Sequence, residues 1–320
     1  MIHHNFKQQF TLNASATTTE PIAHDENKDK MDLFFLNFNI YLMAAGLLGN
    51  ILSVYVFVHR KLLVHKCNWY LLLLTLFELV FCVVVLTDYL FNKFNAKFLH
   101  DYNNISCTVI DLLIHTSDLC SNIVALFLSL DRLYAIKNPL KIHEFVTHLH
   151  AKKLIFTSLL ILIFIRISTY LFCLNVCHDS YIIYCSIISS QIFNTIPILI
   201  ILILNGLLIK ELLSYFRNRS KSGDINELTH CIQKNKLNQT QKFHYFLIVF
   251  LNIYYLLSSI PYYSLITYLD FVELHVFLSN LNIDTIMLTQ IITSSLFNSN
   301  HCINFFIYLI FHADFKFTIK

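Results

Sequence analysis

Long apolar runs separated by short polar segments fill most of the chain. A helix needs about 20 apolar residues to cross about 30 Å of hydrocarbon. Because a backbone in lipid must satisfy its own hydrogen bonds, runs of this length are predicted to be membrane-spanning helices. The predicted spans are Leu36–Val58, Tyr70–Leu90, Cys107–Ile136, Leu154–Cys173, Ile187–Leu213, Phe243–Leu269 and Ile286–Ile310. The pattern therefore predicts an all-α membrane protein, a seven-transmembrane-helix bundle over residues 34–311.

Composition supports a protein whose solvent is lipid. The chain is 56% hydrophobic and 13% charged, with a mean hydropathy of +0.58. A soluble domain of this length does not carry so much apolar surface. The net charge of +3 is small, so no nucleic-acid partner is expected. The nine cysteines contain no Cys-x-x-Cys pair, so the cysteines predict no metal site.

The positions of Lys and Arg predict the orientation in the membrane. With the N-terminus outside, 17 of the 23 Lys and Arg residues lie at cytoplasmic ends and loops, as the positive-inside rule requires. Residues 1–33 are then a disordered extracellular tail without a cleavable signal peptide, and 215–242 form a polar cytoplasmic loop. Two Asn-x-Ser sequences fall outside and are candidate glycosylation sites, Asn13 and Asn104. We expect a multi-pass protein of the plasma membrane.

The last span is the most polar of the seven. A polar helix in lipid must face the interior of a bundle, so this helix is expected to line a cavity. Its polar side chains are Thr289, Gln290, Thr293, Ser294, Ser295, Asn298, Ser299 and Asn300.

Short motifs occur on these spans in a particular order. Cys107 precedes Asp131-Arg132 by 24 residues on the third span. The others are Gly49-Asn50, Glu78-Leu79, Pro139-Leu140, Pro197, Pro261, Asn300, Asn304 and Tyr308. Together they resemble rhodopsin-like (class A) G-protein-coupled receptors over nearly the whole chain. The resemblance implies a receptor that passes an extracellular signal to a heterotrimeric G protein.

The resemblance assigns the coupling switch to the cytoplasmic side. It implies that Asp131 and Arg132, Leu140, Asn304 and Tyr308 take part in coupling. Arg132 would pair with Asp131 at rest and meet the G protein when released, while Leu140 would be an apolar contact. The alternative is that Arg132 only reflects the positive-inside bias. Residues 312–320 would be a short cytoplasmic tail that begins an amphipathic eighth helix.

The chain departs from the family at several switch positions. The family tryptophans of the fourth and sixth spans are absent, and the proline of the last span is Phe305. Leu159 or Leu160 stands at the place of the fourth-span tryptophan, and Ser259 at that of the sixth-span tryptophan. Tyr255 replaces a phenylalanine of the sixth span, Asn205 a tyrosine of the fifth, and Leu133 the aromatic residue after Arg132. A degenerate receptor that no longer couples is therefore an alternative.

Glu78 is an acid in the middle of an apolar span, where a charge is costly without compensation. The resemblance implies a polar pocket made by Glu78, Asn50, Ser121, Asn300 and Asn304. A carboxylate with neutral oxygens suits an allosteric sodium ion. A structural polar cluster is the alternative, and the acid could equally be protonated because burial disfavours the charged form. No other cofactor is expected.

The resemblance also implies an extracellular disulfide from Cys107 to the second outer loop. The candidates there are Cys177, Cys185 and Cys173, and we predict Cys177, which lies 20 residues before Pro197. The exterior is oxidising, so such a bond can persist there.

The ligand is predicted by elimination and by charge. The acid of amine receptors would stand at Ile114 and the retinal lysine of opsins at Asn298, so neither class is expected. Acidic residues gather at the outer end, which favours a cationic peptide ligand. The chain also resembles, in its general pattern, invertebrate receptors for FMRFamide-like neuropeptides. Arg166 either reaches the interface or holds a ligand carboxylate. The candidate ligand residues are Asp88, Asp111, Ile114, His115, Asp270 and Asn298.

Two other classes compete with a receptor. A seven-helix transporter or channel usually shows internal repeats or broken helices, and none is visible. A membrane enzyme needs clustered acids or His inside the spans, and these are sparse. The chain is therefore not expected to be an enzyme.

Overall fold

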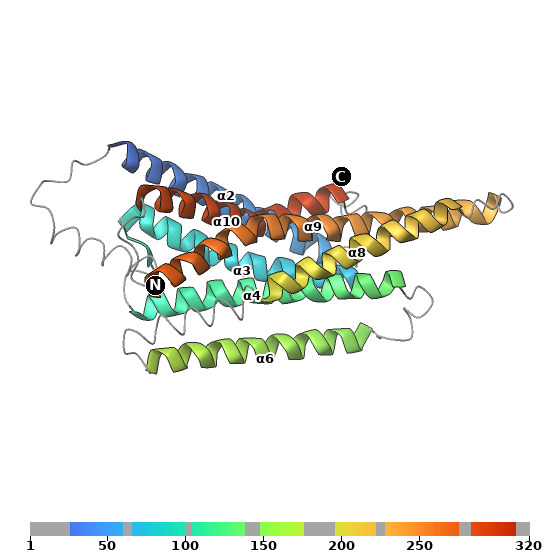
Figure 1. The fold of residues 1–320 in the computed structure, drawn as a ribbon, viewed down its shortest axis with the longest axis horizontal. Helices are drawn as coiled ribbons and strands as arrows, with labels where there is room; N and C mark the ends of the chain where they lie inside the picture. The colour runs from blue at the N-terminus through green and yellow to red at the C-terminus, as the bar shows by residue number, and fades with distance from the viewer. Residues whose placement is uncertain are drawn as a thin grey trace, which may run out of the picture.

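The structure is a computed structural model of the chain. It describes residues 26–59, 66–95, 97–99, 104–137, 148–175, 196–221, 228–274 and 283–311. One helix is found at the place of each predicted span, which confirms the all-α seven-helix prediction (Figure 1). The helices are α2 (Glu26–His59), α3 (Lys66–Asn95), α4 (Asn104–Lys137), α6 (His148–Asn175), α8 (Ile196–Lys221), α9 (Leu228–Leu274) and α10 (Ile283–Phe311).

Six of the helices close into a ring. Helix α2 packs on α3, α3 on α4, α4 on α8, α8 on α9, and α9 on α10, which returns to α2. Contacts of α10 with α3 and of α4 with α9 cross the interior. Helix α6 packs on α4 at the edge of the bundle (Figure 1). Helices α3, α4, α9 and α10 thus surround the centre of the molecule.

Apolar side chains fill the interior and also cover the outside. One buried cluster contains Phe57, Leu128 and Tyr308, and a second contains Met43, Phe81 and Phe297. On α6 the side chains of Phe156, Leu160 and Phe164 are exposed at four-residue spacing, so they form one outward face. Such a face suits lipid. Leu160 points outward, whereas Leu159 is buried in the first cluster.

Helices α2 and α10 approach each other closely because glycine stands at the contact. A Cβ on Gly46 would overlap Cys302 Sγ and lie 3.0 Å from the Cys302 Cα. A Cβ on Gly49 would lie 2.9 Å from the Cβ of Phe305, the residue at the family's proline position. A side chain at Gly46 would therefore require the two helices to shift apart.

Two boundaries differ from those expected. Helix α2 begins at Glu26, inside the segment assigned to the disordered tail. The expected loop at 215–242 is largely helical, because α8 continues to Lys221 and α9 begins at Leu228. Residues 228–242 are polar but contain neither Gly nor Pro, so polarity alone did not exclude a helix there.

Within the described residues, hydropathy and length single out some of the helices as membrane spans. Five helices contain windows long and apolar enough to cross a membrane: Leu33–Val58, Asn68–Asn95, Val109–Lys137, Ile196–Ser214 and Phe246–Leu269. Helix α10 is not among them, and α6 contributes only the shorter apolar stretch Ile155–Ser168. Asn13, Leu140, Cys177 and residues 312–320 lie outside the described residues.

Candidate functional site

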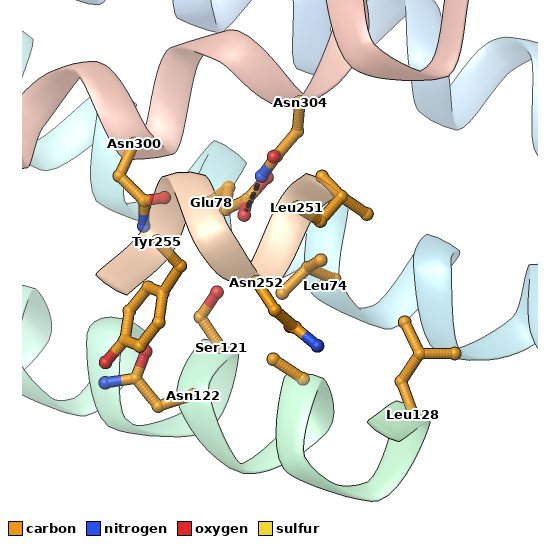
Figure 2. A pocket seen from close by; sticks show the side chains of 11 residues that line it. Leu74, Glu78, Ser121, Asn122, Leu128, Leu251, Asn252, Tyr255, Asn300 and Asn304 are labelled. Carbon is orange, nitrogen blue, oxygen red and sulfur yellow. Dashed lines mark hydrogen bonds between the residues drawn. The ribbon is translucent and has the colours of Figure 1, made fainter. Parts of the chain in front are cut away.

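A small polar cavity lies between α3, α4, α9 and α10. About 20 Å³ of it is open to a water-sized sphere, which is room for about one water molecule. Figure 2 shows its walls. It is lined by Leu74, Glu78, Ser121, Asn122, Ala125, Leu128, Leu251, Asn252, Tyr255, Asn300 and Asn304.

Helical spacing brings the polar side chains to this cavity. Asn300 and Asn304 stand one turn apart on α10, so both face the same way. Leu74 and Glu78 repeat that spacing on α3, and Ser121 faces them from α4. The structure thus brings together four of the five residues expected in the polar pocket.

Glu78 is the central group of the cavity. Its side chain is only 1% exposed, and its Oε1 accepts a hydrogen bond from Asn304 Nδ2 (Figure 2). The hydroxyl of Ser121 lies near the carboxylate. Among the described residues, Glu78 Oε2 makes no hydrogen bond of ordinary geometry. A buried oxygen with spare acceptor capacity beside a water-sized space needs a proton, a water molecule or a cation.

Asn50, the fifth expected residue, does not line the cavity. Its Nδ2 donates to the backbone carbonyl of His301 at 2.9 Å and contacts Cys82 Sγ at 3.7 Å. Asn50 therefore joins α2 to α10 and α3, and belongs to the helix contacts rather than to the cavity wall.

The chemistry of the cavity suits a small cation. Sodium takes oxygen ligands, and Glu78, Ser121, Asn300 and Asn304 present a carboxylate, a hydroxyl and two amide carbonyl groups. The unbonded Oε2 of Glu78 gives such an ion an anionic partner. The residues present therefore fit a sodium ion, and its charge would offset that of the buried carboxylate.

Sequence reasoning did not assign the three other polar residues of the wall to the cavity: Asn122, Asn252 and Tyr255. Asn252 is a polar side chain inside an apolar stretch. That feature was the available signal, because such groups in a span usually face the bundle interior.

A second polar cluster that the sequence did not reveal surrounds Asp118 on α4. Tyr263 of α9 donates its hydroxyl to Asp118 Oδ2, and Asn122 Nδ2 lies 3.4 Å from the same oxygen. Asp118 Oδ1 lies 3.6 Å from His301 Nε2 of α10. The His301 ring stacks on Phe81, with centroids 3.7 Å apart. This cluster links α4, α9 and α10 above the cavity.

The cytoplasmic end of α4 carries the predicted switch pair. Arg132 Nη2 lies 3.6 Å from Asp131 Oδ2, and both side chains are partly exposed. Tyr308 of α10 is fully buried, with its ring edge against Phe57 of α2 at 5.5 Å. Arg132 is thus beside its neighbouring acid and near the cytoplasmic surface, while Tyr308 belongs to the core.

Two of the candidate ligand residues are engaged in the bundle. Asn298 Nδ2 contacts Asn39 Oδ1 at 3.2 Å and the Tyr89 hydroxyl at 3.0 Å. Ile114 packs against the second apolar cluster. Both positions therefore contribute to helix packing.

The charged outer candidates lie around α4. Asp88 is buried on α3, while Asp111 and His115 on α4 are partly buried. Arg166 is buried, and its charge reaches both His115 and Asp118. It therefore sits inside the bundle and not at the lipid interface. The side chains of Asp270, Cys107 and Asn104 lie outside the described ones.

Comparisons with known proteins identify the family. Residues 49–308 match the family model described as 7 transmembrane receptor (rhodopsin family). The chain belongs to this family. A similar solved structure is the crystal structure of squid rhodopsin, with a TM-score of 0.70 and 15% identity over 90% of this chain and 85% of that one. At that identity the likeness shows the fold alone. A comparison with curated protein sequences gave no match.

Family membership settles the class of protein. The chain is a G-protein-coupled receptor of the rhodopsin type and a multi-pass membrane protein. The prediction that it is a receptor and not an enzyme is confirmed. The transporter and channel alternatives are wrong.

Proposed function

We propose that the chain is a plasma-membrane receptor for a cationic extracellular peptide, of the neuropeptide class, and that it signals through a heterotrimeric G protein. The observation that carries the ligand class is the excess of acids at the outer end. The sequence places Asp88, Asp101, Asp111, Asp179, Asp270, Glu273 and Asp284 there. Opposite charge on a peptide would speed its encounter and fix its orientation.

The structure also disfavours the two main alternatives. The amine-receptor acid is replaced by Ile114, whose partly buried side chain packs against the second apolar cluster. The opsin lysine is replaced by Asn298, which is bonded to Asn39 and Tyr89. An acidic rim without either group favours a peptide that binds near the surface of the bundle.

We assign coupling to the cytoplasmic end of α4. Arg132 is charged at any physiological pH and offers five donors, and a partly exposed acid, Asp131, lies 3.6 Å away. An ion pair that is partly exposed is weak, so a G protein could displace Asp131 from it. Helix α4 also forms one wall of the cavity around Glu78, which would hold a sodium ion through Glu78, Ser121 and the α10 amides.

The test is a ligand screen on cells that express the chain. The probe is a library of amidated neuropeptides divided into basic, neutral and acidic pools, with biogenic amines as a separate pool. The proposal predicts that the basic pool raises signalling and that Asp111→Asn lowers the potency of its active peptide. Activation by the amine pool or by the acidic pool alone would overturn it.

A further inference from the structure

One amide group on α9 joins three helices in the inner half of the bundle. Asn252 Nδ2 donates to Ser129 Oγ of α4 at 2.8 Å and to Asn205 Oδ1 of α8 at 2.7 Å. Asn252 is 2% exposed, and both of its partners are buried. Both bonds have ordinary lengths for hydrogen bonds.

The surroundings of this junction of Asn252, Ser129 and Asn205 offer few other polar partners among the described residues. The nearby core of the same helices is apolar and includes Leu128, Leu208, Ile248 and Leu251. Within the described residues, Asn205 Nδ2 has no hydrogen-bond partner, and Asn205 Oδ1 accepts the bond from Asn252. Loss of the Asn252 bonds would therefore leave Asn205 Oδ1 without its partner in this core, whereas the Ser129 hydroxyl keeps its bond to Ala125 O of its own helix at 2.8 Å. The junction is therefore a discrete tie that is either closed or open.

Helix α9 makes different polar contacts on the two sides of Pro261. That proline stands inside α9 and removes a backbone hydrogen bond there, which permits bending. Outward of it, Tyr263 is bonded to Asp118. Inward of it, Tyr254 meets Ser299 of α10 at 2.6 Å. If the Asn252 tie opens, the inner part of α9 stays on α10 but loses its polar hold on α4 and α8.

The position of the tie connects it to signalling. Ser129 precedes the Asp131-Arg132 pair by two residues on α4. Asn252 also lines the cavity that contains Glu78 and Asn304. A change at the cavity would thus act directly on the tie, and release of the tie would act directly beside Arg132.

We propose that Asn252 is a polar latch that holds the inner half of α9 against α4 and α8 and thereby sets the agonist-independent activity of the chain. The activity readout rests on the proposed coupling to a G protein, whereas the latch itself is a property of the helices. The latched and open arrangements exchange as two populations, and each bond lost shifts that ratio.

The variants separate the two bonds from other effects. Asn252→Ala removes both bonds, and Ser129→Ala or Asn205→Ala removes one. The matched control is Ser258→Ala on the same helix. Among the described residues, the Ser258 hydroxyl donates only to carbonyls of its own helix, Tyr254 O at 2.9 Å and Tyr255 O at 3.0 Å. We expect Asn252→Ala to raise the open-to-latched ratio about sevenfold, which is about 1.2 kcal/mol for two interhelical bonds in a membrane.

The first measurement needs no G protein. Spin labels are attached through non-natural amino acids at the exposed positions Leu213 of α8 and Phe246 of α9, and the distance distribution is measured in lipid nanodiscs. Asn252→Ala should enlarge the long-distance population, the single-bond variants should do so less, and Ser258→Ala should leave it unchanged. An identical distribution in Asn252→Ala and the unmutated chain would overturn the latch.

The second measurement is agonist-free uptake of a GTP analogue by a purified heterotrimer. The latch predicts the same order of variants as the distance measurement. One outcome is that the spin-label distances change but neither the unmutated chain nor any variant stimulates uptake. In that case the latch stands and the proposed coupling fails. If uptake is stimulated equally by all variants, the latch does not set basal activity and the proposal is wrong.

Discussion

Replacement of Glu78 by Gln tests whether the buried cavity binds a cation. The change keeps the fold, because a Gln carbonyl can still accept the hydrogen bond that Asn304 donates to Oε1. It replaces the unbonded Oε2 with an amide and removes the negative charge. The cavity has room for about one water-sized occupant, so the expected stoichiometry is one ion.

The size of the effect follows from binding linkage. An ion that binds only the folded receptor stabilises it by about 1.4 kcal/mol when its concentration is ten times its Kd. For a large domain this raises Tm by roughly 3 to 5 °C. The unmutated receptor should therefore melt at a higher temperature in sodium chloride than in potassium chloride of equal ionic strength. Glu78→Gln should melt at the same temperature in both salts.

The matched control is Asp118→Asn, the same acid-to-amide change at a buried acid that does not line the cavity. It should keep the sodium response, even if its Tm in both salts is lower because the Tyr263 contact is weakened. The assay is thermal unfolding of purified receptor in nanodiscs, followed by a thiol-reactive dye. An equal sodium effect in the unmutated receptor and in Glu78→Gln would refute the cation site.

Other predictions concern packing and the disulfide. Gly46→Ala should lower the free energy of unfolding by about 1–3 kcal/mol, because its Cβ would overlap Cys302. Gly206→Ala should leave Tm unchanged or slightly higher, because nothing lies within 4 Å of a Cβ there. Equal melting of the two variants would show that the α2–α10 contact is looser than described. Cys177→Ser should abolish surface expression or ligand response, measured by antibody staining of intact cells. Normal staining and response in that variant, with loss in Cys185→Ser, would place the disulfide on the other cysteine.

The helices could be predicted from local rules, and the members of the polar pocket from the resemblance to the receptor family. Apolar length predicts a span, and the Asn300 and Asn304 spacing predicts one inward face on a helix. Glu78 stood out because an acid in a span must be compensated. These arguments need only the sequence and the family order of the spans.

The interhelical contacts could not be predicted in the same way. Asn50, which was assigned to the pocket, turns instead to the His301 carbonyl, and that depends on the rotation of α2 against α10. The contact of Asp118 with His301 and Tyr263 joins residues up to 183 positions apart in sequence. Helix rotation is set by packing of whole surfaces, such as the Gly46 contact with Cys302. No single position in the sequence reports it.

The most direct test of the account is whether Arg132 couples the chain to a G protein. The measurement is the rate of GTP-analogue uptake by purified heterotrimers on membranes that contain the receptor, compared with Arg132→Ala and Lys137→Ala. Lys137 is the matched control, since it is a nearby exposed cation that pairs with Glu211 at 3.6 Å. The account predicts stimulated uptake with the unmutated receptor and with Lys137→Ala, and loss of most of it with Arg132→Ala at equal surface expression. Uptake by Arg132→Ala equal to that of the unmutated receptor, or no stimulation over empty membranes with any heterotrimer, would contradict it.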